Sequence, residues 1–144
     1  MAGPLANCDS RPMSETVHAV TVLAVDDHPR FLEAAQAVVE ATPGFAWLGG
    51  VSSGAEALAA ADREEPDLML VDVNMPEMNG FELARELDDS HPRTLVALIS
   101  AQDPDELPHD RGGAERTVVR KEILGSAWLR ALWRRHRGED PPAK

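Results

Sequence analysis

The sequence predicts an α/β fold in which a doubly wound, five-stranded parallel sheet is covered by helices on both faces. Five short apolar runs, rich in β-branched residues, alternate with stretches whose apolar residues recur at helical spacing. The connections between them are short, and such alternation favours parallel strands joined by crossover helices. Several of the runs are apolar at every position, which is typical of strands buried on both faces.

The first half of the chain supplies two strands and two helices. TVLAV, residues 21–25, reads as a buried central strand, and FAWLGGV, residues 45–51, as a second strand. The helix between them ends at Pro43-Gly44, and its apolar face is expected to comprise Phe31, Ala34, Ala35, Val38 and Val39. Ser53 is expected to cap the next helix, GAEALAAADREE, which Pro66 ends.

The second half supplies three more strands. DLMLVD, residues 67–72, is followed by the turn NMPEMNG and the helical stretch FELARELDD. TLVALIS, residues 94–100, and TVVRK, residues 117–121, are the fourth and fifth strands. Between these two strands Pro104 and Pro108 predict that any helix is short or irregular.

The last helix, ILGSAWLRALWRRHR, is amphipathic. Its spacing places Leu129 and Trp133 on a flank beside the face that we expect to pack on the sheet, which comprises Ala127, Trp128, Ala131 and Leu132. We expect Leu129 and Trp133 to form a partner or homodimer surface. The alternative is that Trp133 closes the edge of the core.

The length of 144 residues fits one domain, which we place at residues 17–137, with a disordered leader at 1–16 and a disordered tail at 138–144. No apolar run approaches the roughly 18 residues of a membrane span, and the start lacks the features of a signal peptide. We therefore expect a cytoplasmic protein with no membrane contact. The single cysteine, Cys8, excludes an internal disulfide.

The charge is distributed unevenly along the chain. Residues 1–110 carry 21 acids and 5 bases, a net charge of −16, whereas residues 111–144 carry 4 acids and 9 bases, a net charge of +5. An acidic body disfavours non-specific nucleic-acid binding, so we expect no direct contact with nucleic acid. The arginines near the end of the chain are expected to interact favourably with the negative, C-terminal end of the dipole of the last helix.

Polar side chains follow four of the predicted strands at the point where each strand ends. They are Asp26 and Asp27, Asp72, Ser100 and Lys121. Because ligands of open parallel sheets bind outside the carboxyl ends of the strands, these side chains are expected to converge on one rim. Any one of them alone is more often a helix cap or a surface residue; their joint placement indicates a functional site.

Three converging carboxylates predict a magnesium site. Mg²⁺ takes oxygen ligands, keeps several waters and shares phosphate oxygens, and it relieves the repulsion between the carboxylates. A metal-neutralised site lets a carboxylate act as a nucleophile toward a phosphoryl group and form an acyl phosphate. Lys121 would balance the phosphoryl charge, and Ser100 could donate a hydrogen bond to one of its oxygens.

Four strings resemble, in order and spacing, signatures of the receiver domains of two-component response regulators. They are VLAVDDHPRFLEAAQAVVE, DLMLVDVNMPEMNGFELARELD, LVALISAQD and VVRK, and they cover roughly residues 20–136. The second string is the most specific. The resemblance implies a flavodoxin-like (βα)5 fold and a single-domain regulator similar to the chemotaxis regulators. It also implies a histidine kinase or phosphotransfer protein as donor and a downstream protein as target.

The resemblance also implies a role for each site residue. Asp72 matches the phosphoacceptor, Asp27 a direct Mg²⁺ ligand and Asp26 a ligand through water. Asn74 matches a ligand through its backbone carbonyl. Ser100 resembles the hydroxyl residue that contacts the phosphoryl group, and Lys121 resembles the lysine that contacts it. Met75-Pro76 and Gly80 match the loop that closes the acceptor turn.

The chain departs from the family pattern close to Lys121. Val118 stands where the family usually has an aromatic residue, and Glu122 stands where a proline commonly follows the lysine. A valine has one stiff torsion and cannot report phosphorylation by swinging a ring inward. We therefore expect another element to report it, either the segment 103–113 or the last helix.

Three other functions compete with a phosphorylated single-domain regulator. A receiver fold could act as a docking module without phosphorylation, but the acidic set argues against this. An aspartate-nucleophile phosphohydrolase would carry a second acid where Asn74 stands. The third is the receiver part of a DNA-binding regulator, since VDDHPRFLE resembles the receivers of such proteins. Because the chain ends at Lys144, we expect no DNA-binding domain.

Overall fold

A computed structural model describes residues 19–75, 79–101 and 118–137, and it contains one five-stranded sheet with the order β2-β1-β3-β4-β5. All paired strands are parallel. The strands are β1 (Val20–Val25), β2 (Phe45–Val51), β3 (Leu68–Asp72), β4 (Leu95–Ser100) and β5 (Val118–Arg120). The helices are α1 (Pro29–Glu40), α2 (Gly54–Glu64), α3 (Gly80–Ser90) and α4 (Ser126–Arg137), with a 3-10 turn at Lys121–Ile123.

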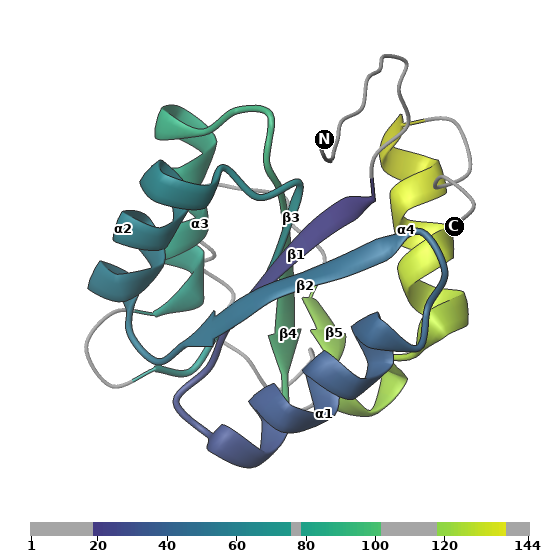
Figure 1. Cartoon of the computed structure of the whole chain (residues 1–144). Helices are drawn as coiled ribbons and strands as arrows, with labels where there is room; N and C mark the ends of the chain where they lie inside the picture. The colour runs from purple at the N-terminus through teal and green to yellow at the C-terminus, as the bar shows by residue number, and fades with distance from the viewer. Residues whose placement is uncertain (1–18, 76–78, 102–117, 138–144) are drawn as a thin grey trace, which may run out of the picture.

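The predicted α/β sheet is confirmed, with helices on both faces (Figure 1). The leader, the tail and the proline-containing segment between β4 and β5 lie outside the described residues, so the predictions made for them stay predictions. No helix in the described ranges combines the length and the apolar character that crossing a bilayer requires.

The central strands bury alternate side chains in two separate cores. In β1, Val22 and Ala24 pack on the side of α1 and α4, whereas Leu23 and Val25 pack on the side of α2 and α3. The residues of β3 divide in the same way. Side chains of a strand point alternately to opposite faces, so continuously apolar strands must lie between two helical layers.

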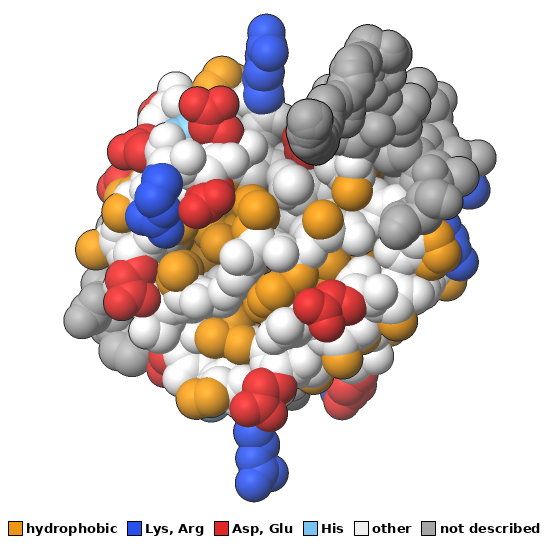
Figure 2. Space-filling view, in the orientation of Figure 1, with side chains coloured by type: hydrophobic (Ala, Val, Ile, Leu, Met, Phe, Trp, Pro, Cys, Tyr) orange, Lys and Arg blue, Asp and Glu red, His pale blue; other side chains and the backbone are white. Residues whose placement is uncertain are grey.

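The sheet has one edge at β2, which pairs only with β1. Trp47, Leu48 and Val51 of this strand are half-buried rather than buried. Figure 2 shows hydrophobic side chains gathered around β2 on this face of the molecule. β1 and β3, the strands whose ends carry the buried aspartates, are instead enclosed within the sheet.

Two of the described helices begin with a side-chain cap that satisfies a backbone N–H of their first turn. The Ser53 hydroxyl accepts a hydrogen bond from the backbone N–H of Glu56, as predicted for the start of α2. Asn79 caps α3 in the same way by accepting from the N–H of Glu82. Of the five residues expected on the face of α1, Ala35 and Val39 are buried, whereas Ala34 is exposed, so the inner stripe is narrower than predicted.

The orientation predicted for the last helix is wrong. Leu129 is 0% exposed and Trp133 is 7% exposed, and both lie in the core between α1, α4 and the sheet. Ala127, which we expected to face the sheet, is exposed. The apolar arc of α4 is broad, since Trp128 and Leu132 also pack against this core, so the spacing of apolar residues alone does not show which of them lies at its centre. The buried pair removes the basis for a dimer surface through Leu129 and Trp133.

We predict that Leu129→Ala lowers the free energy of unfolding by about 2–5 kcal/mol and Trp133→Ala by about 3–5 kcal/mol, because each leaves a cavity. Arg135→Ala on the exposed side of α4 should change it by less than about 0.5 kcal/mol. Urea denaturation followed by circular dichroism measures these changes. A Trp133→Ala protein with unchanged stability but altered self-association would restore the surface interpretation.

Candidate functional site

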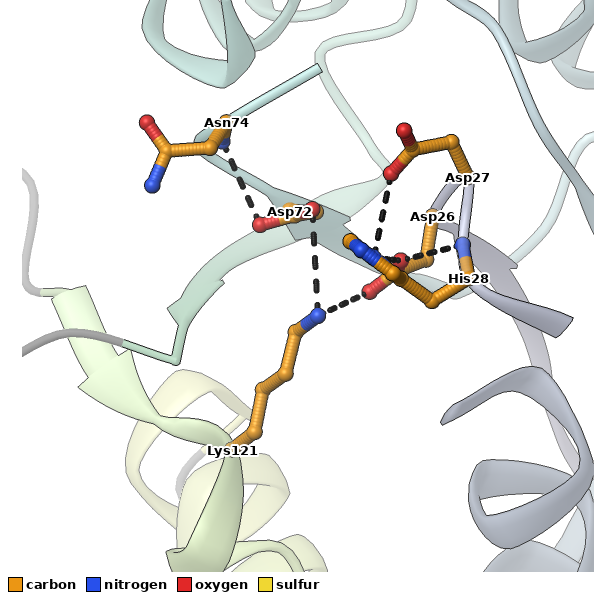
Figure 3. Close-up of polar contacts among 6 residues, drawn as sticks. All are labelled: Asp26, Asp27, His28, Asp72, Asn74 and Lys121. Carbon is orange, nitrogen blue, oxygen red and sulfur yellow. Dashed lines mark hydrogen bonds and ion pairs between the residues drawn. The ribbon is translucent and has the colours of Figure 1, made fainter. Parts of the chain in front are cut away.

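Five of the six predicted site residues lie along the carboxyl ends of four neighbouring strands. Asp26 follows β1, Asp72 ends β3 and Ser100 ends β4, and the side chains of all three are buried. Asp27 follows Asp26, and Lys121 begins the turn after β5 and extends its side chain toward these strand ends (Figure 3). Because β1 and β3 each lie between two other strands, Asp26 and Asp72 have a neighbouring strand on either side.

Lys121 connects the two buried carboxylates. Its Nζ atom lies 2.6 Å from Asp26 Oδ2 and 3.8 Å from Asp72 Oδ2, and its side chain is 15% exposed (Figure 3). The shorter contact is a direct ion pair, whereas the longer one is at the limit of ion-pair distance. The ammonium group is thus held mainly by Asp26, within reach of Asp72.

His28 is a site residue that the sequence analysis missed. Its backbone N–H donates to Asp26 Oδ1 at 2.8 Å, and its Nδ1 lies 2.9 Å from that oxygen and 3.1 Å from Asp27 Oδ1 (Figure 3). The hydrogen bond to Asp26 and the negative charge of Asp27 raise the pKa of His28. The signal was present in the sequence, because an imidazole directly after two acids and before the Pro29 that begins α1 falls beside both carboxylates.

Burial is the main reason that the pKa of Asp72 is raised to about 6, and the nearby negative charge of Asp26 raises it further. Two interactions oppose this shift: the backbone N–H of Asn74, which donates to Asp72 Oδ1 at 3.2 Å, and the charge of Lys121. Asp72 is therefore ionised at neutral pH but holds its proton more tightly than an ordinary carboxyl group.

The oxygens of the site fit a hard divalent cation. Asp26 Oδ2 and Asp27 Oδ1 are buried, and the partners that the described residues offer them are the Lys121 ammonium for Asp26 and the His28 imidazole for Asp27. Asp26, Asp27, His28 and Asp72 each offer one ligand atom, and these atoms lie within 4.8 Å of one another. Mg²⁺ binds such carboxylate oxygens and completes its shell with water.

Ser100 and Asn74 flank Asp72 on two sides. Asp72 pairs with Ile99 in the β3–β4 register, so Ser100 lies one residue beyond this pair at the same end of the sheet. Asn74 follows Asp72 by two residues and is exposed, and its backbone N–H holds one oxygen of Asp72. A role for the Asn74 carbonyl as a metal ligand stays a prediction.

The turn after Asp72 depends on Gly80. Its N–H donates to the Val73 carbonyl at 3.0 Å, and a Cβ atom at this position would lie 2.5 Å from the Asp72 carbonyl oxygen and 2.7 Å from the Val73 Cα atom. Both neighbours are backbone atoms, which cannot move aside cheaply. A side chain at residue 80 would therefore push α3 away from the strand that carries Asp72.

The arrangement has counterparts in known proteins. Residues 22–116 match the family model described as the response regulator receiver domain, about two thirds of the chain. The chain belongs to this family. The nitrate/nitrite response regulator protein NarL of Escherichia coli K12 is 30% identical over 83% of this chain and 56% of its own length. A protein-glutamate methylesterase/protein-glutamine glutaminase of Methanospirillum hungatei is 31% identical over 61% of this chain and 25% of its own length.

Solved structures show the same receiver fold. A signal receiver domain from Mycobacterium tuberculosis has a TM-score of 0.72 at 27% identity, with 85% of this chain and 99% of that one covered. The response regulator domain of Thermotoga maritima CheB has a TM-score of 0.68 at 21% identity over 86% and 100% of the two chains. This chain spans about half or less of the curated relatives named above, so their activities as whole proteins do not transfer directly.

Val118 of this receiver domain is 5% exposed and lies in the core with α2 and α3. The position at which the family usually has an aromatic residue is therefore filled by a buried aliphatic side chain. The segment 103–113, which we expected to report phosphorylation in its place, lies outside the described residues.

The raised pKa of Asp72 predicts a pH-dependent gain in stability for Asp72→Asn. The folded receiver binds the Asp72 proton more tightly than the unfolded chain, so the charged carboxylate opposes folding above about pH 6. Without divalent cations, Asp72→Asn should raise the free energy of unfolding by roughly 2 kcal/mol at pH 7.5. The gain should shrink below pH 6 and disappear only below about pH 3, where Asp72 is protonated in both the folded and the unfolded state.

Urea denaturation across this pH range measures the effect, and Asp89→Asn on the exposed side of α3 is the matched control. A gain of similar size for Asp89→Asn, or a gain that does not change with pH, would contradict the assigned pKa shift.

Proposed function

We propose that this receiver domain, spanning residues 17–137, accepts a phosphoryl group on Asp72 in a Mg²⁺-dependent reaction. The observation that carries this proposal is the position of Asp72: a buried, ionised carboxylate with Asp26 and Asp27 on one side and the ammonium of Lys121 on the other. The donor is a histidine kinase, a phosphotransfer protein or a small acyl phosphate.

In the proposed reaction, an oxygen of the Asp72 carboxylate forms a bond to phosphorus while the bond from phosphorus to the donor's nitrogen or oxygen breaks. The products are an acyl phosphate and the free donor group. Asn74 holds Oδ1 of Asp72 through its N–H, and Oδ2 faces Lys121. The raised pKa also favours reaction, because a more basic carboxylate is a better nucleophile as long as it stays ionised.

The other residues of the site balance the charge that the phosphoryl group brings. Asp26, Asp27, Asp72 and the Asn74 carbonyl would hold a Mg²⁺ ion, which would supply positive charge close to the phosphoryl group. Lys121 is close enough to Asp72 to pair with one phosphoryl oxygen, and Ser100 donates a hydrogen bond to another. Aspartate phosphorylation would thus be catalysed by the receiver's own residues, without action on another substrate.

We further propose that the phosphorylated receiver signals through contacts with a downstream protein. Several curated relatives are named as transcriptional regulators, among them DegU of Brevibacillus brevis and YdfI of Bacillus subtilis. These names favour, as the second candidate, a receiver that controls a DNA-binding unit. The two outputs are contacts with a downstream protein and control of a DNA-binding unit. Which histidine kinases and regulators are encoded beside this chain would discriminate between them.

We predict that Asp27→Ala weakens Mg²⁺ binding at least about tenfold, because it removes a carboxylate ligand. Asp89→Ala, which removes an exposed carboxylate of α3, is the control and should bind Mg²⁺ as the wild type does. Isothermal titration calorimetry measures both affinities. Equal Mg²⁺ affinities for wild type and Asp27→Ala would show that the ion binds elsewhere.

We also predict that acetyl phosphate with Mg²⁺ adds one phosphoryl group, located on Asp72 by mass spectrometry of peptides. Asp72→Asn should abolish the adduct, because an amide is a poor nucleophile, whereas Asp89→Asn should leave it unchanged. An adduct that persists in Asp72→Asn, or that maps to another residue, would overturn the assignment.

A further inference from the structure

Phe31 is not one of the residues assigned to the metal or phosphoryl site. Its ring nevertheless lies beside Lys121 of that site. The Lys121 Nζ atom sits over the ring of Phe31, 4.7 Å from the ring centroid. This distance is within the range in which an ammonium group is attracted to the negative face of an aromatic ring. The ammonium group therefore lies beside the carboxylates of Asp26 and Asp72 and over the face of Phe31.

The backbone fixes Phe31 relative to Asp26. Phe31 lies in the first turn of α1, where its N–H donates to the His28 carbonyl at 3.1 Å. The N–H of His28 donates in turn to Asp26 Oδ1. Phe31 is half-buried and packs against the core between α1, α4 and the sheet. A short, hydrogen-bonded segment thus sets the ring and one carboxylate in place around the same ammonium.

The ring offers Lys121 a contact that does not depend on the state of the carboxylates. In the structure the closest partner of Lys121 is Asp26, at 2.6 Å. If Asp26 shares its charge with a divalent cation, its attraction for the ammonium weakens, and the two cations repel each other. A ring face carries no lone pair that a magnesium ion would take, so its attraction for the ammonium remains.

We propose that Phe31 is a positioning residue, whose ring holds the Lys121 ammonium beside Asp72 when Asp26 is occupied by the metal, ready to pair with the phosphoryl oxygens. This inference rests on the proposed function. It extends that function to α1, because a residue of this helix then contributes to the affinity of the site for a phosphoryl group. The side chain of Lys121 is mostly buried, which strengthens an interaction that water would otherwise weaken.

The first test measures binding of beryllium trifluoride, a phosphoryl mimic, in the presence of Mg²⁺. Phe31→Leu keeps an apolar side chain but removes the ring, and it should weaken mimic binding about threefold to thirtyfold. Phe31→Tyr and Phe31→Trp keep a ring face and should bind within about twofold of the wild type. The control is Val38→Ala, which trims a half-buried residue of the same helix and core without touching Lys121, and it should leave mimic binding unchanged.

The second test observes the contact itself by NMR, with no phosphoryl group or metal added. Protons of the Lys121 side chain near its Nζ should resonate upfield in the wild type because they lie over the ring, and this shift should disappear in Phe31→Leu. Unfolding by urea shows whether each variant is folded. This measurement is independent of whether Asp72 accepts a phosphoryl group.

The outcomes separate the two proposals. The inference is overturned if Phe31→Leu binds the mimic as the wild type does, if Phe31→Tyr and Phe31→Trp fail to restore binding, or if the Lys121 protons show no upfield shift. A wild-type receiver that shows the upfield shift but binds no mimic would instead contradict the proposed function, and with it the role of the ring in phosphoryl binding.

Discussion

The repulsion between carboxylates at adjacent strand ends is the constraint on which this site depends. Asp26 and Asp72 are buried at the ends of neighbouring strands, and Asp27 is beside them. Such a set can persist in a folded protein only if positive charge lies near it. Lys121 provides that charge in the structure, a protonated His28 adds to it, and a divalent cation would provide more. Burial is the main reason that the pKa of Asp72 is nevertheless raised, and the negative charge of Asp26 raises it further.

The fold creates this constraint by covering both faces of the sheet. Because β1 and β3 are enclosed by two helical layers, a carboxylate at their ends loses most of its contact with water. Burial raises the pKa of Asp72, and it also strengthens the electrostatic interactions of Lys121. The same packing therefore makes the site costly to fold and, in the function proposed above, reactive toward a phosphoryl group.

The first turn of α1 and the start of α3 position the site in different ways. His28 immediately precedes α1 and places an imidazole beside the acids, and Phe31 in the first turn of α1 places a ring beside the lysine. Gly80 lets α3 begin against the backbone of β3 directly after Asp72. The function of this receiver thus depends on the residues that join strands to helices as much as on the acids themselves.

The sequence alone determined the strands, most helix positions and the set of polar residues at one edge of the sheet, because apolar periodicity and short connections are local properties. Parallel strands end at one edge, so the order of the strands along the chain is enough to group Asp26, Asp27, Asp72, Ser100 and Lys121. The Ser53 cap likewise follows from chemistry within a single turn of the chain.

Only the tertiary structure decided which side of each helix faces inward and which side chains meet across the site. The arc of α4 is apolar over a wide angle, so the packing of α4 against α1 and the sheet decides that Leu129 and Trp133 are the buried residues. The contacts of Lys121 join residues that are far apart in the sequence. The raised pKa of Asp72 is likewise a tertiary property, because desolvation requires helices on both faces of the sheet.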